Sequence, residues 1–369
     1  MSQQAESPRF IDASDLLLVK PPPLFTPEQM ARYTPESVFV RHAGFFDPSA
    51  ALDRLHDPEI QGKHFIGIDI GGDKFVSQEY AIDNNTLSPQ YNYGPYSMEA
   101  RKGEEAKYLD FLEVLAESRM PVGLSIAGPV DGTRIIELPN LPILKKAMQD
   151  RYAGDFANLG INAVANDAVA VTMGSAVAAV DLSPHTRNVI VGINGGGWGG
   201  AVWKDGEIYA AEMGHTPADP MINPFDEEYA EACGVNGATF TCLEKVAASG
   251  AGIERLWERI QGEKLDGREI AKLLKYADYV ALQLYDYATT GTAMGLLGFA
   301  DVFDMKGDAE GTAYLLHGGA FRVPHFGQRV EQILEANLGY KPHVIYTESV
   351  SPTQNIGLDG AAIAALMAA

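Results

Sequence analysis

The pair Asn166-Asp167 places a carboxylate in the middle of the otherwise apolar run 163–170. Asp and Asn are good helix caps, and on the pair alone a helix capped by Asp167 is the simpler interpretation. An acid framed by apolar residues is also well placed to face a cleft. Two glycine-rich loops and the run Glu212-Met-Gly-His215 elsewhere in the chain favour a catalytic role for Asp167.

Both glycine-rich loops follow an expected strand. Gly71-Gly72-Asp73-Lys74 follows the strand 64–70, and the run 195–200 follows the strand 188–193. Backbone N–H groups exposed in such turns can bind an anion such as phosphate. Tight hairpin turns would explain one pair of glycines equally well, but two equivalent loops favour a nucleotide held between two lobes. Neither loop has the spacing of a P-loop or of the dinucleotide-binding G-x-G-x-x-G.

The order of strand, glycine loop and hairpin occurs twice, about 125 residues apart, which indicates an internal duplication. The hairpins are expected to include 75–82 in the first half and 201–209 in the second, where Asp205-Gly206 supplies the turn. Further strands are expected at 121–126, 161–165 and 313–317, and helices at 103–118, 242–262, 267–296 and 356–366.

The composition is that of a globular protein, with 369 residues of which 46% are hydrophobic and 21% charged. This length predicts two domains or lobes. There is no apolar run of about 18 residues, so no membrane span is expected, and the N-terminus does not have the pattern of a secretory signal. The net charge of −21 argues against a nucleic-acid partner. Two cysteines, Cys233 and Cys242, argue against a disulfide framework and favour a cytoplasmic setting.

Residues 1–62 form a distinct segment that holds eight of the 21 prolines and five phenylalanines. We interpret it as an extended arm with short helices that packs on the body of the protein. A disordered tail, the alternative, fits residues 1–9 better than the remainder, which carries the aromatic residues.

Six motifs in order resemble the ROK family of sugar kinases and sugar-responsive repressors, within the actin and hexokinase superfamily. They are Asp69-Ile-Gly-Gly-Asp-Lys74, Ala127-Gly-Pro-Val130, Pro139-Asn-Leu141, Asn166-Asp-Ala168, Glu212-Met-Gly-His215 and Cys242-Leu-Glu244. The resemblance runs from about residue 64 to the C-terminus. It implies an α/β fold of two actin-like, ribonuclease H-like duplicated lobes with a cleft between them. The N-terminal lobe would span 63–165 with the C-terminal helix 357–369, and the C-terminal lobe would span 166–356.

The resemblance also implies transfer of the γ-phosphoryl group of ATP to a hydroxyl of a sugar or sugar-like polyol, with Mg²⁺, by a homodimer. Asp167 would be the general base. Sugar-binding residues would be Asn140, Asn166, Glu212, His215 and Glu244. Cofactor-binding residues would be Asp69, Gly71, Gly72, Asp73, Lys74, Gly195, Gly196, Gly197, Gly318 and Gly319.

Two loops depart from the family pattern on the phosphate side. Asp73 stands where the family has Thr, and an acid there would repel a phosphate unless Mg²⁺ lay between them. Gly196 replaces a second Thr, and the bulky Trp198 replaces a smaller aliphatic residue. The alternative function is therefore a non-catalytic carbohydrate-binding or sensing protein. Asp167 favours the kinase, while the net charge and the absence of a DNA-binding pattern in the arm argue against a repressor.

A zinc motif is partly present. The family joins the histidine of this Gly-His pair to three cysteines, whereas this sequence offers His215, Cys233 and Cys242. Structural zinc normally takes four ligands. Glu231 could be the fourth, and two reduced thiols in a metal-free loop are the alternative.

Overall fold

The computed structural model describes residues 13–31, 40–71, 74–93, 96–97, 106–139, 141–218, 231–233, 240–246 and 248–369. Three of the predicted site residues, Gly72, Asp73 and Asn140, lie outside these ranges, as does the side chain of Lys74. Within them, no helix is both long enough and apolar enough to span a membrane.

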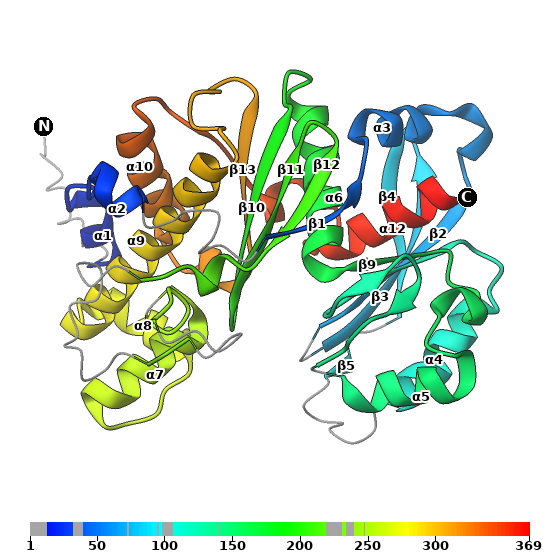
Figure 1. The fold of residues 1–369 in the computed structure, drawn as a ribbon, viewed down its shortest axis with the longest axis horizontal. Coiled ribbons are helices and arrows are strands. Elements are labelled where there is room, and N and C mark those ends of the chain that lie inside the picture. The colour runs from blue at the N-terminus through cyan, green and yellow to red at the C-terminus, as the bar shows by residue number, and fades with distance from the viewer. Residues whose placement is uncertain are drawn as a thin grey trace, which may run out of the picture.

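Two mixed sheets form the cores of two lobes (Figure 1). The first sheet contains β2 (His64–Ile70), β3 (Lys74–Asp83), β4 (Thr86–Asn92), β5 (Tyr96–Ser97), β6 (Val122–Ile126) and β9 (Ala163–Asn166). The second contains β1 (Val40–Phe45), β10 (Asn188–Asn194), β11 (Trp198–Lys204), β12 (Glu207–Ala211), β13 (Thr312–His317) and β14 (His343–Tyr346). A small hairpin consists of β7 (Val130–Asp131) and β8 (Arg134–Ile135).

The strand order is the same in both lobes. It is β4-β3-β2-β6-β9 in the first sheet and β12-β11-β10-β13-β14 in the second, where β1 adds one more strand beside β12. In each lobe the leading strand, β2 or β10, pairs antiparallel with the hairpin strand that follows it and parallel with the next strand. The predicted two-lobed α/β fold and the internal duplication are therefore confirmed.

Helices pack on these sheets and on one another. Those of the first half are α1 (Leu16–Val19), α2 (Pro27–Ala31), α3 (Pro48–His56), α4 (Ala106–Ala116), α5 (Pro142–Tyr152) and α6 (Asp167–Leu182). Those of the second half are α7 (Gly250–Gln261), α8 (Gly267–Leu273), α9 (Tyr279–Val302), α10 (Phe326–Leu338), α11 (Thr347–Val350) and α12 (Ile356–Ala368).

Two predicted helices were wrong in extent. The expected helix 267–296 is divided into α8 and α9, because Ala277 adopts a left-handed conformation with φ of 55° and Asp278 then caps α9. The expected helix 242–262 begins only at Gly250, since Cys242 lies in a bridge with Pro217.

Helices α6 and α12 cross between the two sheets (Figure 1). Their backbones approach so closely that a Cβ on Gly360 would lie 1.8 Å from the carbonyl oxygen of Ala170. The same is true of α12 on β6, where a Cβ on Gly123 would lie 1.8 Å from the oxygen of Ala361. One apolar cluster is shared by these helices and both sheets. The small residues of α6 and α12 thus join the lobes through a continuous core.

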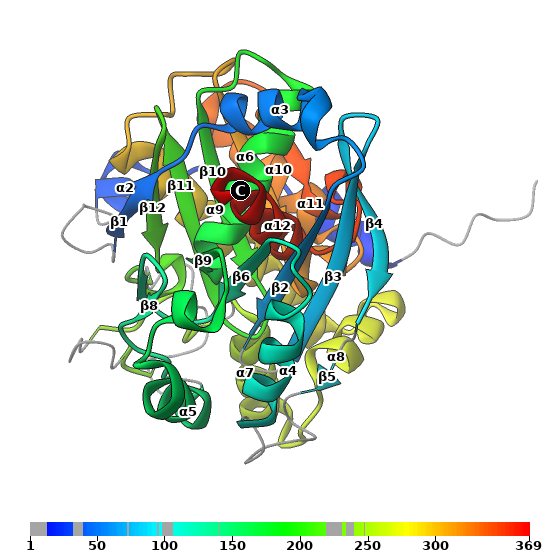
Figure 2. The same ribbon diagram turned by 90° about the vertical axis from the view of Figure 1, so that its right-hand side faces the viewer.

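The described part of the N-terminal arm contacts both lobes. Strand β1 pairs antiparallel with β12, and α3 lies over α6 and α12 (Figure 2). The fully buried Arg329 of α10 donates to the carbonyl oxygens of Lys20 at 2.6 Å and Pro21 at 3.2 Å. Its charge is matched by Asp286 at 3.4 Å.

Candidate functional site

Asp167 is the first residue of α6, and the helix cap is its neighbour Asn166. The Asn166 Oδ1 accepts the Ala168 N–H at 3.1 Å, while its Nδ2 donates to the Gly128 carbonyl at 3.2 Å. The structure thereby separates two roles that the sequence left together. Asn166 provides the cap. The half-buried Asp167 carboxylate accepts a hydrogen bond from the Ala168 N–H at 2.9 Å.

Neighbouring strand ends bring other acids near Asp167. Ile70 of β2 pairs with Ile126 of β6, which pairs with Asn166 of β9, so Asp69 and Asp167 lie at one edge of the sheet. Burial is the main cause that raises the pKa of Asp167 to about 6; the Ala168 N–H opposes it, and the negative charges of Asp69 and Glu212 add to it. A carboxylate with a pKa near neutrality is suited to accept a proton. Glu212 belongs to the second lobe, so the pKa of Asp167 depends on charges from both lobes.

Asp69 is held by two residues that the sequence analysis did not identify. Asp69 is buried, and its carboxylate accepts hydrogen bonds from the Ser125 hydroxyl at 2.8 Å and from the Asn355 Nδ2 at 3.1 Å. Ser125 is the one polar residue of the strand Val122–Ile126, and Asn355 caps α12 by accepting the Gly357 N–H. A polar residue inside a buried strand and a cap before the last helix were the available signals. The half-buried Gly71 follows at the end of the same strand as Asp69.

The glycine loop of the second lobe is fixed from behind. The carbonyls of Gly195 and Gly196 accept the N–H groups of Gly250 at 2.8 Å and Ala251 at 3.0 Å, at the start of α7. The Gly195 N–H donates to the Gly197 carbonyl at 2.9 Å. Gly196 and Gly197 remain exposed to solvent. The loop is therefore fixed by hydrogen bonds to α7 while its tip stays accessible to a ligand.

Gly318 and Gly319 lie beside this loop, because Ile193 of β10 pairs with His317 of β13. Gly318 has φ of 113°, and a Cβ there would lie 2.2 Å from the Asn194 carbonyl oxygen. Only glycine fits that position. A Cβ on Gly319 would meet no atom within 4 Å, so this residue faces open space. The predicted cofactor-binding glycines Gly195–Gly197 and Gly318-Gly319 thus lie at the same edge of the second sheet.

Trp198 does not block the loop. Its ring is 2% exposed and packs on α9, where a Cβ on Gly295 would lie 2.0 Å from the ring. Gly295 supplies the space that the larger side chain requires. The substitution of an aliphatic residue by Trp198 is accommodated in the core.

Two of the other predicted sugar-binding residues, Glu212 and His215, follow β12. Glu212 is exposed, and the short 3₁₀ turn Met213–His215 leads to a half-buried His215. Glu244 is brought to the same place because its N–H donates to the Gly214 carbonyl at 2.8 Å. Its carboxylate accepts the Trp198 backbone N–H at 3.1 Å. The structure therefore joins Glu244 to the glycine loop as well as to the Glu212-to-His215 turn.

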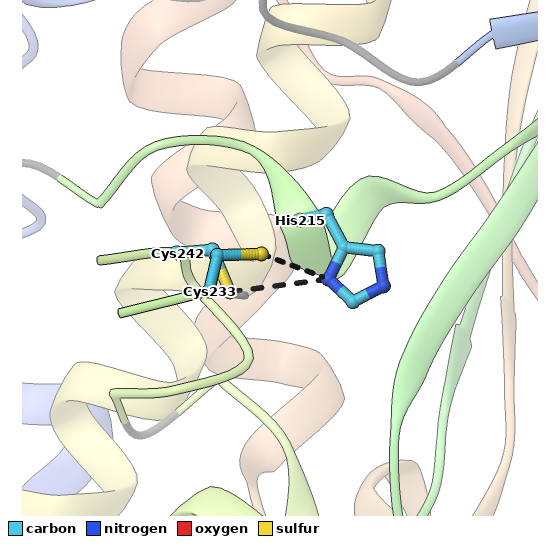
Figure 3. Close-up of side chains that lie close together, drawn as sticks. All are labelled: His215, Cys233 and Cys242. Atoms are coloured by element: carbon cyan, nitrogen blue, oxygen red, sulfur yellow. Dashed lines mark hydrogen bonds between the residues drawn. The ribbon is translucent and has the colours of Figure 1, made fainter. Parts of the chain in front are cut away.

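His215 also faces the two cysteines (Figure 3). Its Nδ1 lies 3.5 Å from the Cys233 sulfur and 3.9 Å from the Cys242 sulfur. Tetrahedral zinc with Zn–N of about 2.05 Å and Zn–S of about 2.3 Å would separate such atoms by about 3.6 Å. The spacing and the soft donors fit zinc. Burial, and then the Cys233 thiol, raise the pKa of Cys242 to about 12, so its thiol is neutral without a metal.

Glu231 is engaged elsewhere. Its carboxylate forms ion pairs with Arg259 and, at 3.8 Å, with Arg255. The hypothesis that Glu231 is the fourth zinc ligand is therefore not supported by this arrangement. In the part of the chain that the structure describes, the group able to hold a metal through His, Cys, Asp or Glu is His215, Cys233 and Cys242.

Comparison with known proteins shows the family of the chain and its fold. The model of the ROK family matches residues 65–367, and the chain belongs to that family. A curated relative is the N-acetylgalactosamine kinase AgaK of a Shewanella species (strain ANA-3). It is 29% identical over 255 residues, which cover 63% of this chain and 75% of AgaK.

Solved structures show the same fold. The ROK hexokinase of Thermus thermophilus superposes with a TM-score of 0.55 at 23% identity, covering 82% of this chain and 98% of the hexokinase. A ROK glucokinase of Streptomyces griseus, solved with glucose and AMPPNP, gives a TM-score of 0.55 at 21% identity, with 81% and 98% covered. A crystal structure of a hexokinase gives 0.61 at 14% identity, and here 96% of this chain and 98% of the other are covered.

Proposed function

We propose that this protein is an ATP-dependent sugar kinase in which Asp167 is the general base. The observation that carries the proposal is the environment of Asp167, a carboxylate at a strand end whose pKa is raised to about 6 near acids of both lobes. Membership of the ROK family and the sugar-kinase relatives support the same reaction class.

In this reaction Asp167 accepts the proton of a sugar hydroxyl as the hydroxyl oxygen forms a bond to the γ-phosphorus of ATP. The bond from that phosphorus to the bridging oxygen breaks and ADP leaves. Asn166, Glu212, His215 and Glu244 orient the acceptor through hydrogen bonds to its hydroxyls. Asn140 is assigned the same task by the family motif alone.

The phosphates are assigned to the glycines of both loops and to Gly318 and Gly319, whose backbone N–H groups suit an anion. Mg²⁺, when bound, supplies positive charge to the phosphates, and Asp69 offers it a hard oxygen donor. With Gly196 in place of a threonine, the second loop relies on its backbone. Water is excluded by closure of the lobes, which protects ATP from hydrolysis. We further assign the protein as a cytoplasmic homodimer.

The test is a turnover assay with Mg-ATP and a panel of hexoses, amino sugars and polyols, in which ADP release is measured. We expect activity on at least one sugar and its loss in Asp167→Asn. If sugars raise the melting temperature but no sugar is phosphorylated, the protein is a carbohydrate sensor and the kinase assignment is wrong.

Zinc is tested by metal analysis of protein purified without chelators. We expect about one zinc per chain and its loss in Cys242→Ser, because His215 and one thiol alone are a poor zinc site. A stoichiometry near zero in the unaltered protein would remove zinc from the proposal and leave two reduced thiols.

A further inference from the structure

Three segments of the second lobe meet at Glu244, through its carboxylate and through the backbone beside it. The glycine loop contributes the Trp198 N–H, which Glu244 Oε2 accepts at 3.1 Å. The turn after β12 contributes the Gly214 carbonyl, which accepts the Glu244 N–H at 2.8 Å. The third segment is 242–244 itself. It is anchored to the same turn a second time, since the Leu243 N–H donates to the Thr216 carbonyl at 3.0 Å.

Glycine makes room for the carboxylate on two sides. A Cβ on Gly197 would lie 3.2 Å from Glu244 Oε2, and a Cβ on Gly214 would lie 3.0 Å from the same atom. The carboxylate therefore occupies a space between the loop assigned to phosphate and the turn assigned to sugar. Glu244 is half-buried, so the group remains within reach of a ligand.

We propose that Glu244 couples the two substrates, so that a bound sugar tightens nucleotide binding through the Glu244–Trp198 hydrogen bond. The coupling rests on the proposed function, because only a kinase of this kind binds a sugar and a nucleotide together. A carboxylate accepts several hydrogen bonds, so the group that holds the Trp198 N–H can also accept a sugar hydroxyl.

The coupling follows from ordering. A sugar that fixes the Glu244 side chain also fixes the acceptor of the Trp198 N–H, and the loop is then ordered before the nucleotide arrives. Less freedom is lost on nucleotide binding, and the affinity rises. Linkage makes the effect reciprocal, so the nucleotide must tighten sugar binding by the same factor. Gly196 offers no hydroxyl to the phosphates, so the nucleotide affinity of this loop depends on the position of its backbone N–H groups.

The experiment measures the affinity for Mg·AMP-PNP by calorimetry, without sugar and with a saturating sugar. The sugar is the one of glucose, mannose, N-acetylglucosamine, N-acetylgalactosamine and N-acetylmannosamine that gives the largest thermal shift. We expect a sugar-induced gain in nucleotide affinity of about tenfold in the unaltered protein, within the usual range of such couplings. In Glu244→Ala the sugar should no longer change the nucleotide affinity. In Glu244→Gln the gain should persist, because the amide oxygen can still accept the Trp198 N–H.

Glu212→Ala is the matched control. Glu212 is also assigned to the sugar, but within the described residues no hydrogen bond joins its side chain to the loop. This variant should therefore bind sugar more weakly and keep the tenfold gain once sugar is saturating. Gly197→Ala tests the link from the other side, because its Cβ would press on Glu244 Oε2; the gain should shrink although Glu244 is intact. Circular dichroism melts establish that each variant is folded.

A tenfold gain that survives in both Glu244→Ala and Gly197→Ala would overturn the coupling and leave the kinase assignment untouched. If no sugar of the panel binds to the unaltered protein, the proposed function fails and the coupling fails with it.

Discussion

The two lobes share one sheet topology, yet their strand ends carry different chemistry. The first lobe presents side chains there, namely Asp69 near the end of β2 and Asn166-Asp167 where β9 passes into α6. The second lobe presents backbone, with glycines after β10 and β13. Ligands of open α/β sheets bind outside the carboxyl ends of the strands. Under the proposed function, the same scaffold supplies the proton acceptor in the first lobe, while most of the backbone assigned to the phosphates lies in the second.

The two strand ends are also stabilised differently. Asp69 is oriented by two side chains, Ser125 and Asn355. The loop at Gly195 and Gly196 is oriented by backbone N–H groups of α7. An acid needs donors that fix its carboxylate, whereas a glycine loop needs its carbonyls occupied so that its N–H groups can face a ligand.

The sharpest test of this comparison is Asp167→Asn. We expect kcat to fall by about 100-fold or more, the usual contribution of a general base, while sugar affinity stays within a few fold. Asp181→Asn, at the exposed end of the same helix, is the control and should leave kcat unchanged. Equal turnover in both variants would show that the acid of the first lobe does not take the proton.

The pH profile tests the same acid without a mutation. The base must be ionised, and its pKa is raised to about 6. We therefore expect kcat/KM to fall about tenfold for each pH unit below pH 6 and to be level above it. Steady-state rates from pH 5 to 8 would measure this. A level profile down to pH 5 would contradict the assignment of the raised pKa to the catalytic group.

The backbone chemistry of the second lobe is tested by Gly318→Ala. Its Cβ would lie 2.2 Å from the Asn194 oxygen at φ of 113°, so we expect about tenfold weaker Mg·AMP-PNP binding and a loss of about 2 kcal/mol in unfolding free energy. Gly319→Ala is the control, because no atom lies within 4 Å of the added carbon. Calorimetry and urea unfolding would compare the two. Equal behaviour would mean that the close approach to Asn194 is unimportant.

Much of the arrangement was predictable because it is local. Alternating and apolar runs predicted the central strands of both sheets, and the spacing of the two glycine loops predicted the duplication. The outer strands β1, β4, β5 and β14 were not predicted. Asn166-Asp167 was identified for the same reason, since a polar pair within an apolar run is visible in sequence.

The remaining features depend on contacts between distant segments. Asn355 and Asp69 are 286 positions apart, and no pattern around either one predicts their hydrogen bond. The link from Glu244 to Trp198 and the engagement of Glu231 by Arg255 and Arg259 are of the same kind. The helix expected from residue 242 onward was wrong because pairing across the fold competes with helix formation there. Its hydrophobic spacing alone could not show this.

Asn355→Ser tests the support of the first lobe's acid. Serine retains the cap of α12 but loses the long amide donor to Asp69, so we expect a severalfold increase in the Mg²⁺ concentration needed for half-maximal activity. Tyr80→Phe is the control: Tyr80 donates to Asp359 at 2.7 Å in the adjacent buried group, and its loss should affect stability rather than Mg²⁺ dependence. A Mg²⁺ requirement that rises equally in both variants would indicate general loosening.

The smallest expected effect is on stability. It measures how much the half-buried Asp167 carboxylate lowers the free energy of unfolding, independently of any role in catalysis. Burial raises its pKa from 3.8 to about 6, so the folded protein binds this proton more tightly than the unfolded chain does. Ionisation of Asp167 therefore costs stability above pH 6, the cost shrinks as the pH falls from 6 to 4, and it vanishes below about pH 4. We expect Asp167→Asn to unfold with about 1 to 2 kcal/mol more free energy at pH 7.5, because a side chain that keeps some solvent contact pays less than the full shift implies. At pH 4 the two proteins should be equally stable in urea. A variant that is less stable at pH 7.5 would show that the ionised carboxylate stabilises the fold, which contradicts a pKa raised by burial.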